Sequence, residues 1–148
     1  QAASPSPTAT PPTMPAAAKG ASEAAAKAFV RHWIDVLNYA GPAGDARELE
    51  KLSGGKCAAC SAITSLIDDV DKAGGYIRGK GWSVKSIKLL GSARQRRIVE
   101  AQVDVAPQEI RQEAGGESVH FDGGSRLKTF WVGRSKDAWI VTRLDQPE

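Results

Sequence analysis

Cys57 and Cys60 are the only cysteines of the chain, and two residues separate them. They follow a loop of small residues at positions 53–56 and stand at the start of a segment with helical periodicity. This spacing suits a short disulfide, half of a metal site, or a redox centre. Each kind of chemistry would place the chain in a different class of protein.

The metal and redox interpretations lack the context that they need. A redox Cys-x-x-Cys motif usually lies in a βαβ unit, whereas a helix and a glycine-rich loop precede Cys57. Lys56 and the helix N-terminus would favour the Cys57 thiolate, so redox chemistry stays open as an alternative. Zinc would need His32 and His120, whose spacing fits no usual finger. We therefore predict a Cys57–Cys60 disulfide and no metal or cofactor.

A second group of chemical side chains lies on or beside the first predicted helix: His32, Asp35, Asn38 and Tyr39. His32 and Asp35 are three residues apart and could form a pair that acts as a general base in a pocket. The simpler interpretation is a solvated pair beside the apolar stripe, with Asn38 and Tyr39 completing the end of the helix. No nucleophile elbow or phosphate-binding loop accompanies them.

A third candidate site is a basic stretch without an acidic residue before Glu100, and Trp82 lies within it. Such a surface could contact an anionic lipid or a cell-wall polymer, although it could equally be an ordinary solvated strand face. The net charge of +3 is too small to favour nucleic acid as a partner. Its basic residues are Arg78, Lys80, Lys85, Lys88, Arg94, Arg96 and Arg97.

Three predicted helices position the first two groups. Apolar residues from Ala26 to Leu37 recur at helical spacing and predict a helix over 22–40, which Gly41-Pro42 should end. A short helix is expected over Ala46–Leu52. A third helix is expected over Ala58–Ala73 and should stop at a glycine pair.

Beyond residue 75 the period of the apolar residues changes to two, which predicts strands. Helices followed by antiparallel strands indicate an α+β fold with the helices packed on one face of a curved sheet. The expected strands are Tyr76–Arg78, Trp82–Leu90, Arg97–Ala106, Val119–Phe121, Leu127–Val132 and Ala138–Leu144.

Residues 1–20 consist almost entirely of Pro, Ala, Ser and Thr, so they are expected to form a disordered tether. Residues 21–148 should form a single domain. The tether lacks the apolar core of a signal peptide but suits the start of a mature, exported lipoprotein whose signal peptide has been removed. We therefore expect an extracytoplasmic protein that is lipid-anchored to the outer face of the cell membrane.

The order of these features resembles a known family. An Ala/Pro-rich tether, the segment Ala28-Phe29-Val30-Arg31 before Trp33, and the Cys-x-x-Cys helix are similar to a family of uncharacterised actinobacterial lipoproteins (DUF6318). The resemblance implies an NTF2-like cone, in which a bent sheet wraps a long N-terminal helix and leaves a pocket. It implies no catalytic residue.

The sequence thus predicts a non-enzymatic envelope domain that binds an unidentified partner or ligand at the cell surface. The alternatives are a small enzyme that uses the pocket and, less favoured, a thiol-redox protein. A pocket with two converging ionisable side chains would indicate the enzyme. An exposed sulfur would indicate the redox protein.

Overall fold

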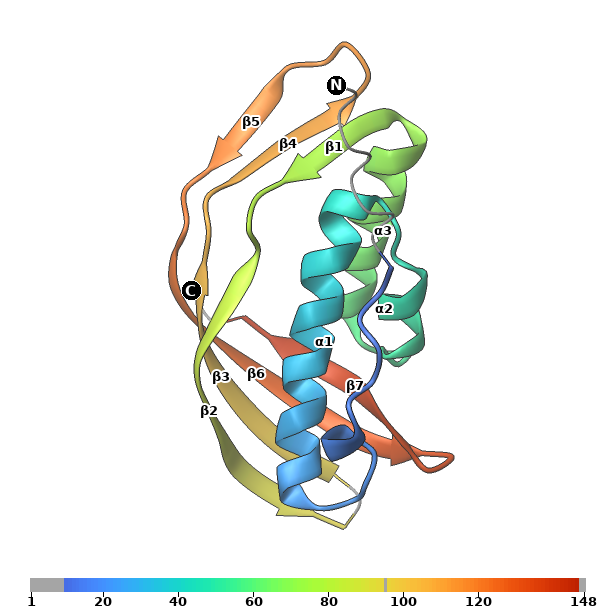
Figure 1. The fold of residues 1–148 in the computed structure, drawn as a ribbon, viewed down its shortest axis with the longest axis vertical. Helices are drawn as coiled ribbons and strands as arrows, with labels where there is room; N and C mark the ends of the chain where they lie inside the picture. The colour runs from blue at the N-terminus through green and yellow to red at the C-terminus, as the bar shows by residue number, and fades with distance from the viewer. Residues whose placement is uncertain (1–9, 95, 147–148) are drawn as a thin grey trace, which may run out of the picture.

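The computed structural model describes residues 10–94 and 96–146 of the chain. Within this part, helices precede strands, and the strands wrap around α1 as a bent surface (Figure 1). The helices are η1 (Ala16–Ala18), α1 (Glu23–Ala43), α2 (Arg47–Lys51) and α3 (Ala58–Lys72). The strands are β1 (Gly74–Arg78), β2 (Trp82–Ala93), β3 (Arg96–Val105), β4 (Gln108–Glu113), β5 (Ser118–Phe121), β6 (Gly124–Ser135) and β7 (Ala138–Asp145).

Helix α1 forms because its N-terminus is capped and one face is apolar. The Ser22 hydroxyl accepts a hydrogen bond from the backbone N–H of Ala25 at 3.0 Å. The helix continues through Pro42, so its expected end at Gly41-Pro42 is wrong. Pro42 lacks the backbone N–H that would bond to the carbonyl four residues earlier, so the last turn loses one helical hydrogen bond. The helix ends instead at Gly44, whose φ of 66° is the left-handed conformation of a C-terminal cap.

Helix α3 begins at the cysteine pair. Cys57 is its N-cap, and the Cys57 sulfur accepts a hydrogen bond from the Cys60 backbone N–H at 3.2 Å. The preceding loop is fixed to the edge of β7, where the Gly54 N–H donates to the Val141 carbonyl at 2.8 Å. The Val141 N–H donates in turn to the Leu52 carbonyl at 2.9 Å. The loop before the disulfide thus pairs with the last strand of the sheet.

The strands form two antiparallel sheets in the orders β2-β3-β6-β7 and β1-β4-β5. The chain passes between them at the β1–β2, β3–β4 and β5–β6 connections, which bends the surface (Figure 1). A Cβ at Gly123 would overlap the Val105 carbonyl, so the last of these bends requires glycine.

Strand β4 was not expected from the sequence. It pairs with both β1 and β5, yet Ile110 is its only buried residue. Its segment therefore lacks the alternation of apolar and polar residues that identified the other strands. Strands β2 and β6 also extend beyond their expected bounds because hydrogen bonding to β3 continues past their apolar stretches.

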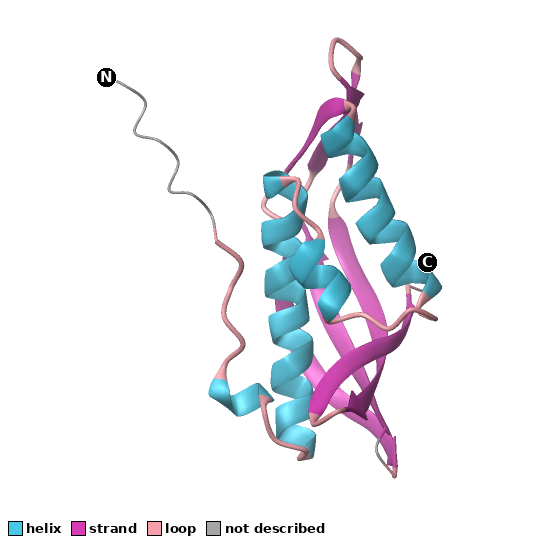
Figure 2. Cartoon of the chain, turned by 90° about the vertical axis from the view of Figure 1, so that its right-hand side faces the viewer, coloured by secondary structure: helices cyan, strands magenta, loops and turns pink. Residues whose placement is uncertain are grey.

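The core lies between α1 and the inner face of the four-stranded sheet. The Trp33 ring packs edge-on against Phe130 at 5.3 Å and lies 6.3 Å from the Trp82 ring, measured between centroids. The helices cover one face of the strands (Figure 2). The predicted α+β class, with helices on one face of a curved antiparallel sheet, is confirmed.

Packing of the chain begins before residue 21, where the domain was expected to start. The helix η1 lies against α1, and Ala18 is buried in the core. The Trp139 indole N–H donates to the Gly20 carbonyl at 2.8 Å. Residues 10–20 therefore contact the domain, while residues 1–9 of the expected tether lie outside the described residues.

None of the helices in the described ranges combines the length and the hydropathy that crossing a membrane would require.

Candidate functional site

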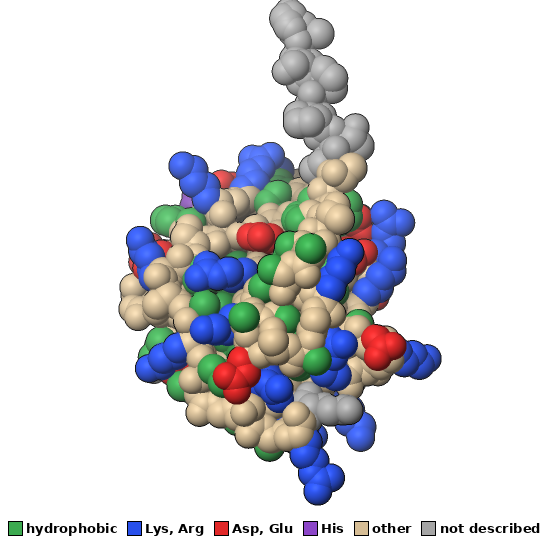
Figure 3. Space-filling view, turned by 60° about the horizontal axis from the view of Figure 1, so that its bottom comes forward, with side chains coloured by type: hydrophobic (Ala, Val, Ile, Leu, Met, Phe, Trp, Pro, Cys, Tyr) green, Lys and Arg blue, Asp and Glu red, His purple; other side chains and the backbone are tan. Residues whose placement is uncertain are grey.

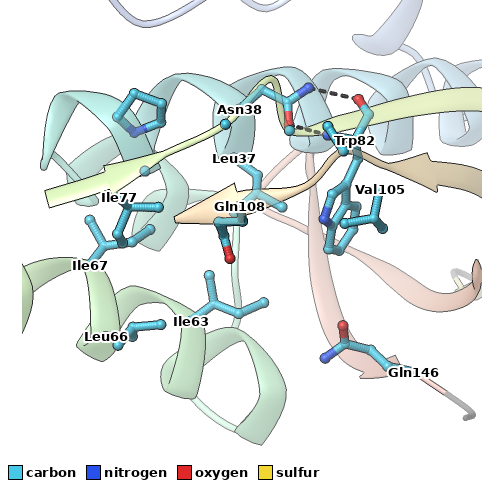
Figure 4. A pocket seen from close by; sticks show the side chains of 15 residues that line it. Leu37, Asn38, Ile63, Leu66, Ile67, Ile77, Trp82, Val105, Gln108 and Gln146 are labelled. Atoms are coloured by element: carbon cyan, nitrogen blue, oxygen red, sulfur yellow. Dashed lines mark hydrogen bonds between the residues drawn. The ribbon is translucent and has the colours of Figure 1, made fainter. Parts of the chain in front are cut away.

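An apolar pocket of about 190 Å³ opens between α1, α3 and the connections at which the sheet bends (Figure 4). Asn38, Gln108 and Gln146 are its polar side chains, and no ionisable side chain lines it among the described residues. Its volume is below the roughly 300–1,000 Å³ of sites for drug-sized ligands, so it suits a small molecule. The apolar wall consists of Leu37, Pro42, Ile63, Leu66, Ile67, Ile77, Trp82, Val105 and Ala106.

The Asn38 side chain fixes Trp82 at the pocket wall (Figure 4). The Asn38 amide donates to the Trp82 carbonyl at 2.9 Å, and its oxygen accepts from the Trp82 backbone N–H at 2.9 Å. The side chain thus bonds β2 as a neighbouring strand would. Gly81 precedes Trp82 with a φ of 82°, and a Cβ there would overlap the Asn38 oxygen.

Lys128 lies behind this wall, with 7% of its surface exposed. Its ammonium donates to the Gln146 side-chain oxygen at 2.7 Å and lies 4.6 Å from the centre of the Trp82 ring. Burial lowers the pKa of Lys128, and the nearby charge of Arg126 lowers it further. Lys128 was not among the residues expected from the sequence. The two-residue spacing of Lys128, Phe130 and Val132 could have identified it. In a strand this spacing places all three side chains on the same inner face.

The four residues that were predicted for a pocket do not meet in this one. Asn38 is the member that lines it. His32 is buried at 2% exposure whereas Asp35 is exposed, so they do not form the solvated pair that the sequence suggested. Burial lowers the pKa of His32, and the charges of Asp35 and Glu48 oppose this effect.

Tyr39 points to a polar cluster beside α2. Its hydroxyl donates to Asp45 at 3.0 Å, and the Arg47 side chain donates to the same carboxylate at 2.9 and 3.1 Å. The Arg47 guanidinium holds the pKa of Asp45 well below its usual range. Partial burial and the neighbouring Asp45 raise the pKa of Tyr39. These contacts hold the α1–α2 connection in place.

The Cys57 and Cys60 sulfur atoms are at disulfide distance, 2.12 Å apart. Each cysteine has 1% of its surface exposed. The pair belongs to the core, in the same cluster as Leu52 and Val141. A thiol reagent or a redox partner therefore has no direct access to either sulfur.

The predicted basic stretch is divided among three environments. The Arg78 guanidinium stacks on Tyr76 at 3.7 Å, and Lys80 is exposed in the β1–β2 connection. Lys85 and Lys88 on β2 form ion pairs with carboxylates of the adjacent β3, at 3.3 and 3.4 Å. The carboxylates belong to Asp104 and Glu100.

The arginines of the β2–β3 turn belong instead to a basic end of the molecule, which we define as Arg94, Arg96, Arg97, Arg134 and Lys136. Arg94, Arg97, Arg134 and Lys136 line a second hollow together with Trp139 and Asp137. The β2–β3 and β6–β7 turns meet because Arg96 pairs with Gly133 across the sheet. Figure 3 shows Lys and Arg side chains spread over the face that it presents, with acidic side chains among them. Arg134 and Lys136 were not expected from the sequence, since only strand pairing brings them there.

Among residues 10–94 and 96–146, no three His, Cys, Asp or Glu side chains group closely enough to hold a metal ion.

Several solved structures share this fold. The intermembrane space region of the chloroplast protein ARC6 is similar with a TM-score of 0.60 and 18% identity, over 82% of this chain and 92% of that one. A candidate aromatic ring hydroxylase from Novosphingobium aromaticivorans has a TM-score of 0.56 and 11% identity, over 81% of this chain and 86% of that one. A candidate Ca/calmodulin-dependent kinase II association domain from Exiguobacterium sibiricum has a TM-score of 0.55 and 9% identity, over 84% of this chain and 92% of that one. No curated protein matches the sequence.

The bent antiparallel sheet around a long N-terminal helix is the NTF2-like arrangement that the sequence resemblance implied. At these identities the solved structures show the fold alone. The chain belongs to the Family of unknown function (DUF6318), which matches residues 2–145. The predicted family is therefore confirmed.

Proposed function

We propose that this chain is a non-enzymatic domain of the cell envelope that binds a small apolar ligand in the pocket beside Trp82. The observation that carries this proposal is the lining of the pocket. Its wall is formed by aliphatic side chains and one tryptophan, with three neutral amides as its polar side chains. Such a pocket gains binding energy from apolar contact and uses few polar groups to orient its ligand.

The pocket enzyme has less support. Acid–base chemistry requires an ionisable side chain within hydrogen-bond reach of the substrate. His32, Asp35 and Tyr39 are not part of the pocket wall, and Tyr39 is engaged by Asp45. The thiol-redox alternative is also weakened, because both sulfur atoms are buried at disulfide distance.

An extracytoplasmic location is supported by the cysteine pair, since disulfides persist mainly in oxidising compartments. The Pro/Ala/Ser/Thr-rich residues 1–20 are typical of a segment that connects a lipid anchor to a folded domain. We therefore place the domain at the outer face of the cell membrane. Acyl labelling of the natural precursor, with and without its signal peptide, would test the anchor.

Ligand binding is tested by titrating 1-octanol, a neutral apolar probe, into ¹⁵N-labelled protein. We expect the largest resonance changes at the Trp82 indole and at the backbone of the pocket residues. Ile63→Trp should fill the pocket and weaken binding at least about tenfold. Leu127→Trp is the matched control, because Leu127 is 43% exposed and lies outside the pocket wall.

Binding in the native protein and in Leu127→Trp, with loss in Ile63→Trp, would support the pocket as the binding site. Absence of binding in the native protein would contradict the proposal. Equal binding by the two tryptophan variants would also contradict it, because octanol would then bind elsewhere.

A further inference from the structure

Lys128 is the only Lys, Arg, Asp or Glu among the described residues that is buried. It is 7% exposed, and it lies on the inner face of β6 with Phe130 and Val132. A buried cation is costly unless it is paired, and such residues are usually retained with a carboxylate partner. The surroundings of Lys128 therefore need an explanation.

The ammonium of Lys128 contacts two residues that line the pocket. One is the side-chain oxygen of Gln146 at 2.7 Å, and the other is the Trp82 ring at 4.6 Å from its centre. Within residues 10–94 and 96–146, no carboxylate forms an ion pair with Lys128. A lysine ammonium has three donors, so it retains capacity beyond the hydrogen bond to Gln146.

We propose that the pocket binds a monocarboxylic acid with a short apolar body, its carboxylate on Lys128 and its hydrocarbon against Leu37, Ile63 and Trp82. This inference rests on the proposed function and specifies its ligand class. A carboxylate beside a buried ammonium interacts more strongly than it would in water, because the surrounding dielectric constant is lower. Gln146 lines the pocket and accepts a hydrogen bond from the ammonium, so it places Lys128 next to the pocket wall.

The charge of the site selects a carboxylate over a phosphate. Lys128 supplies a single positive charge, and no arginine lines this pocket among the described residues. A phosphate group would bring more negative charge than one ammonium balances, and it usually binds several donors or an arginine fork. Burial and Arg126 both lower the pKa of Lys128, and a bound carboxylate would oppose both effects.

The test compares octanoate with 1-octanol by isothermal titration calorimetry at pH 7. We expect the native protein to bind octanoate at least tenfold more tightly than octanol. Lys128→Met keeps an unbranched side chain that is one heavy atom shorter and removes the charge, so it should lose this preference while it still binds octanol. Lys136→Met is the control, because it removes one exposed positive charge from the basic end.

The comparison within the native protein requires no variant to fold. Equal affinity for the two probes would overturn the carboxylate proposal and leave the apolar pocket intact. Failure of both probes to bind would instead contradict the proposed function. A preference for octanoate that persists in Lys128→Met would place the anion elsewhere and overturn the proposal.

Glu148 lies outside the described residues, so a variant of this carboxylate is included in the test. We expect Glu148→Gln to bind octanoate as the native protein does. If octanoate binds to Glu148→Gln but not to the native protein, Glu148 is itself the acidic partner of Lys128. This result would overturn the proposal.

Discussion

The His32 imidazole is held in the interior face of α1, with 2% of its surface exposed. Its burial lowers its pKa below the unperturbed value of 6.5, because the protein interior disfavours the charged form. Asp35 and Glu48 favour the charged form but do not outweigh burial. At the scale of the residue, His32 is therefore a neutral core side chain whose charge is coupled to folding.

We predict that His32 makes the protein less stable in acid. Below pH 6.5 the unfolded chain takes up a proton on His32 more readily than the folded chain does. The free energy of unfolding therefore falls as the pH drops from about 6.5 through the lowered pKa, by at most about 1.4 kcal/mol per pH unit. Urea unfolding between pH 7.5 and 4.5 measures this slope.

The His32→Leu variant should show a shallower slope than the native protein over this range. His120→Leu is the matched control, because the other histidine of the chain is exposed on β5. Asp45 does not affect this comparison. The stability that its lowered pKa contributes is lost only as the pH falls below 3.8, the ordinary pKa of an aspartate. Identical slopes for native protein and His32→Leu would disprove this account.

At the scale of the element, the Asn38 side chain joins α1 to the first residue of β2. Its two hydrogen bonds satisfy both backbone groups of Trp82 at the point where the sheet bends. Gly81 leaves the space that the amide occupies. The position of the Trp82 ring in the pocket depends on this junction between helix and strand.

Asn38→Ala should lower the free energy of unfolding by about 2 kcal/mol, because it leaves the backbone of Trp82 without these partners. Gly81→Ala should also be destabilising, owing to its φ of 82° and the overlap with Asn38. The double variant should be more stable than the sum of the two effects predicts, since shortening Asn38 removes the overlap. Denaturant unfolding of all four proteins measures the coupling.

Gly91→Ala, within β2, is the control for this cycle, because a Cβ there meets only the Ile98 side chain at 3.8 Å. Strict additivity of Asn38→Ala and Gly81→Ala would show that the two residues do not interact.

The elements with a strong apolar period were predictable, and the site was not. Helix α1 and strand β3 follow directly from their apolar spacing. Strand β4 did not, because its pairing with two neighbours, rather than its side chains, holds it in the sheet. The pocket brings together residues from Leu37 to Gln146, so no local spacing could identify it. Asn38 was selected for its position on α1, but its partner Trp82 lies 44 residues away.

At the scale of the whole molecule, two turns of the four-stranded sheet place basic side chains together at one end of the fold. The turns β2–β3 and β6–β7 bring the basic end together, and its hollow contains Asp137 as its only acidic residue among those described. Lys85 and Lys88 do not add to this end, because each pairs with a carboxylate of β3. An anionic membrane or polymer would therefore meet this end rather than the strand face.

We predict that the domain binds vesicles containing phosphatidylglycerol through its basic end. Changing Arg94, Arg96 and Arg97 together to Ala should weaken binding by about 3 kcal/mol at low salt, from roughly 1 kcal/mol for each positive charge near the surface. Rising salt should weaken binding of the native protein steeply, because screening reduces the attraction. Vesicle sedimentation over a range of salt concentrations measures both effects.

A triple variant that changes Lys51, Lys56 and Lys72 to Ala is the control, since it removes the same charge from the exposed surface of the helical region. Equal weakening in the two triple variants would indicate a general effect of net charge. Salt-independent binding, or none, would argue against a role for the basic end.

The pairing of the loop before Cys57 with Val141 has a consequence for association between molecules. β7 is an edge strand, and an uncovered edge offers unpaired N–H and C=O groups to strands of other chains. The loop occupies both backbone groups of Val141 and so blocks this part of the edge. At the opposite edge, Lys85 and Lys88 on β2 place charges where a second sheet would have to dock. The cysteine pair stands directly after the blocking loop, so reduction that loosens it would expose β7 and promote aggregation through sheet edges.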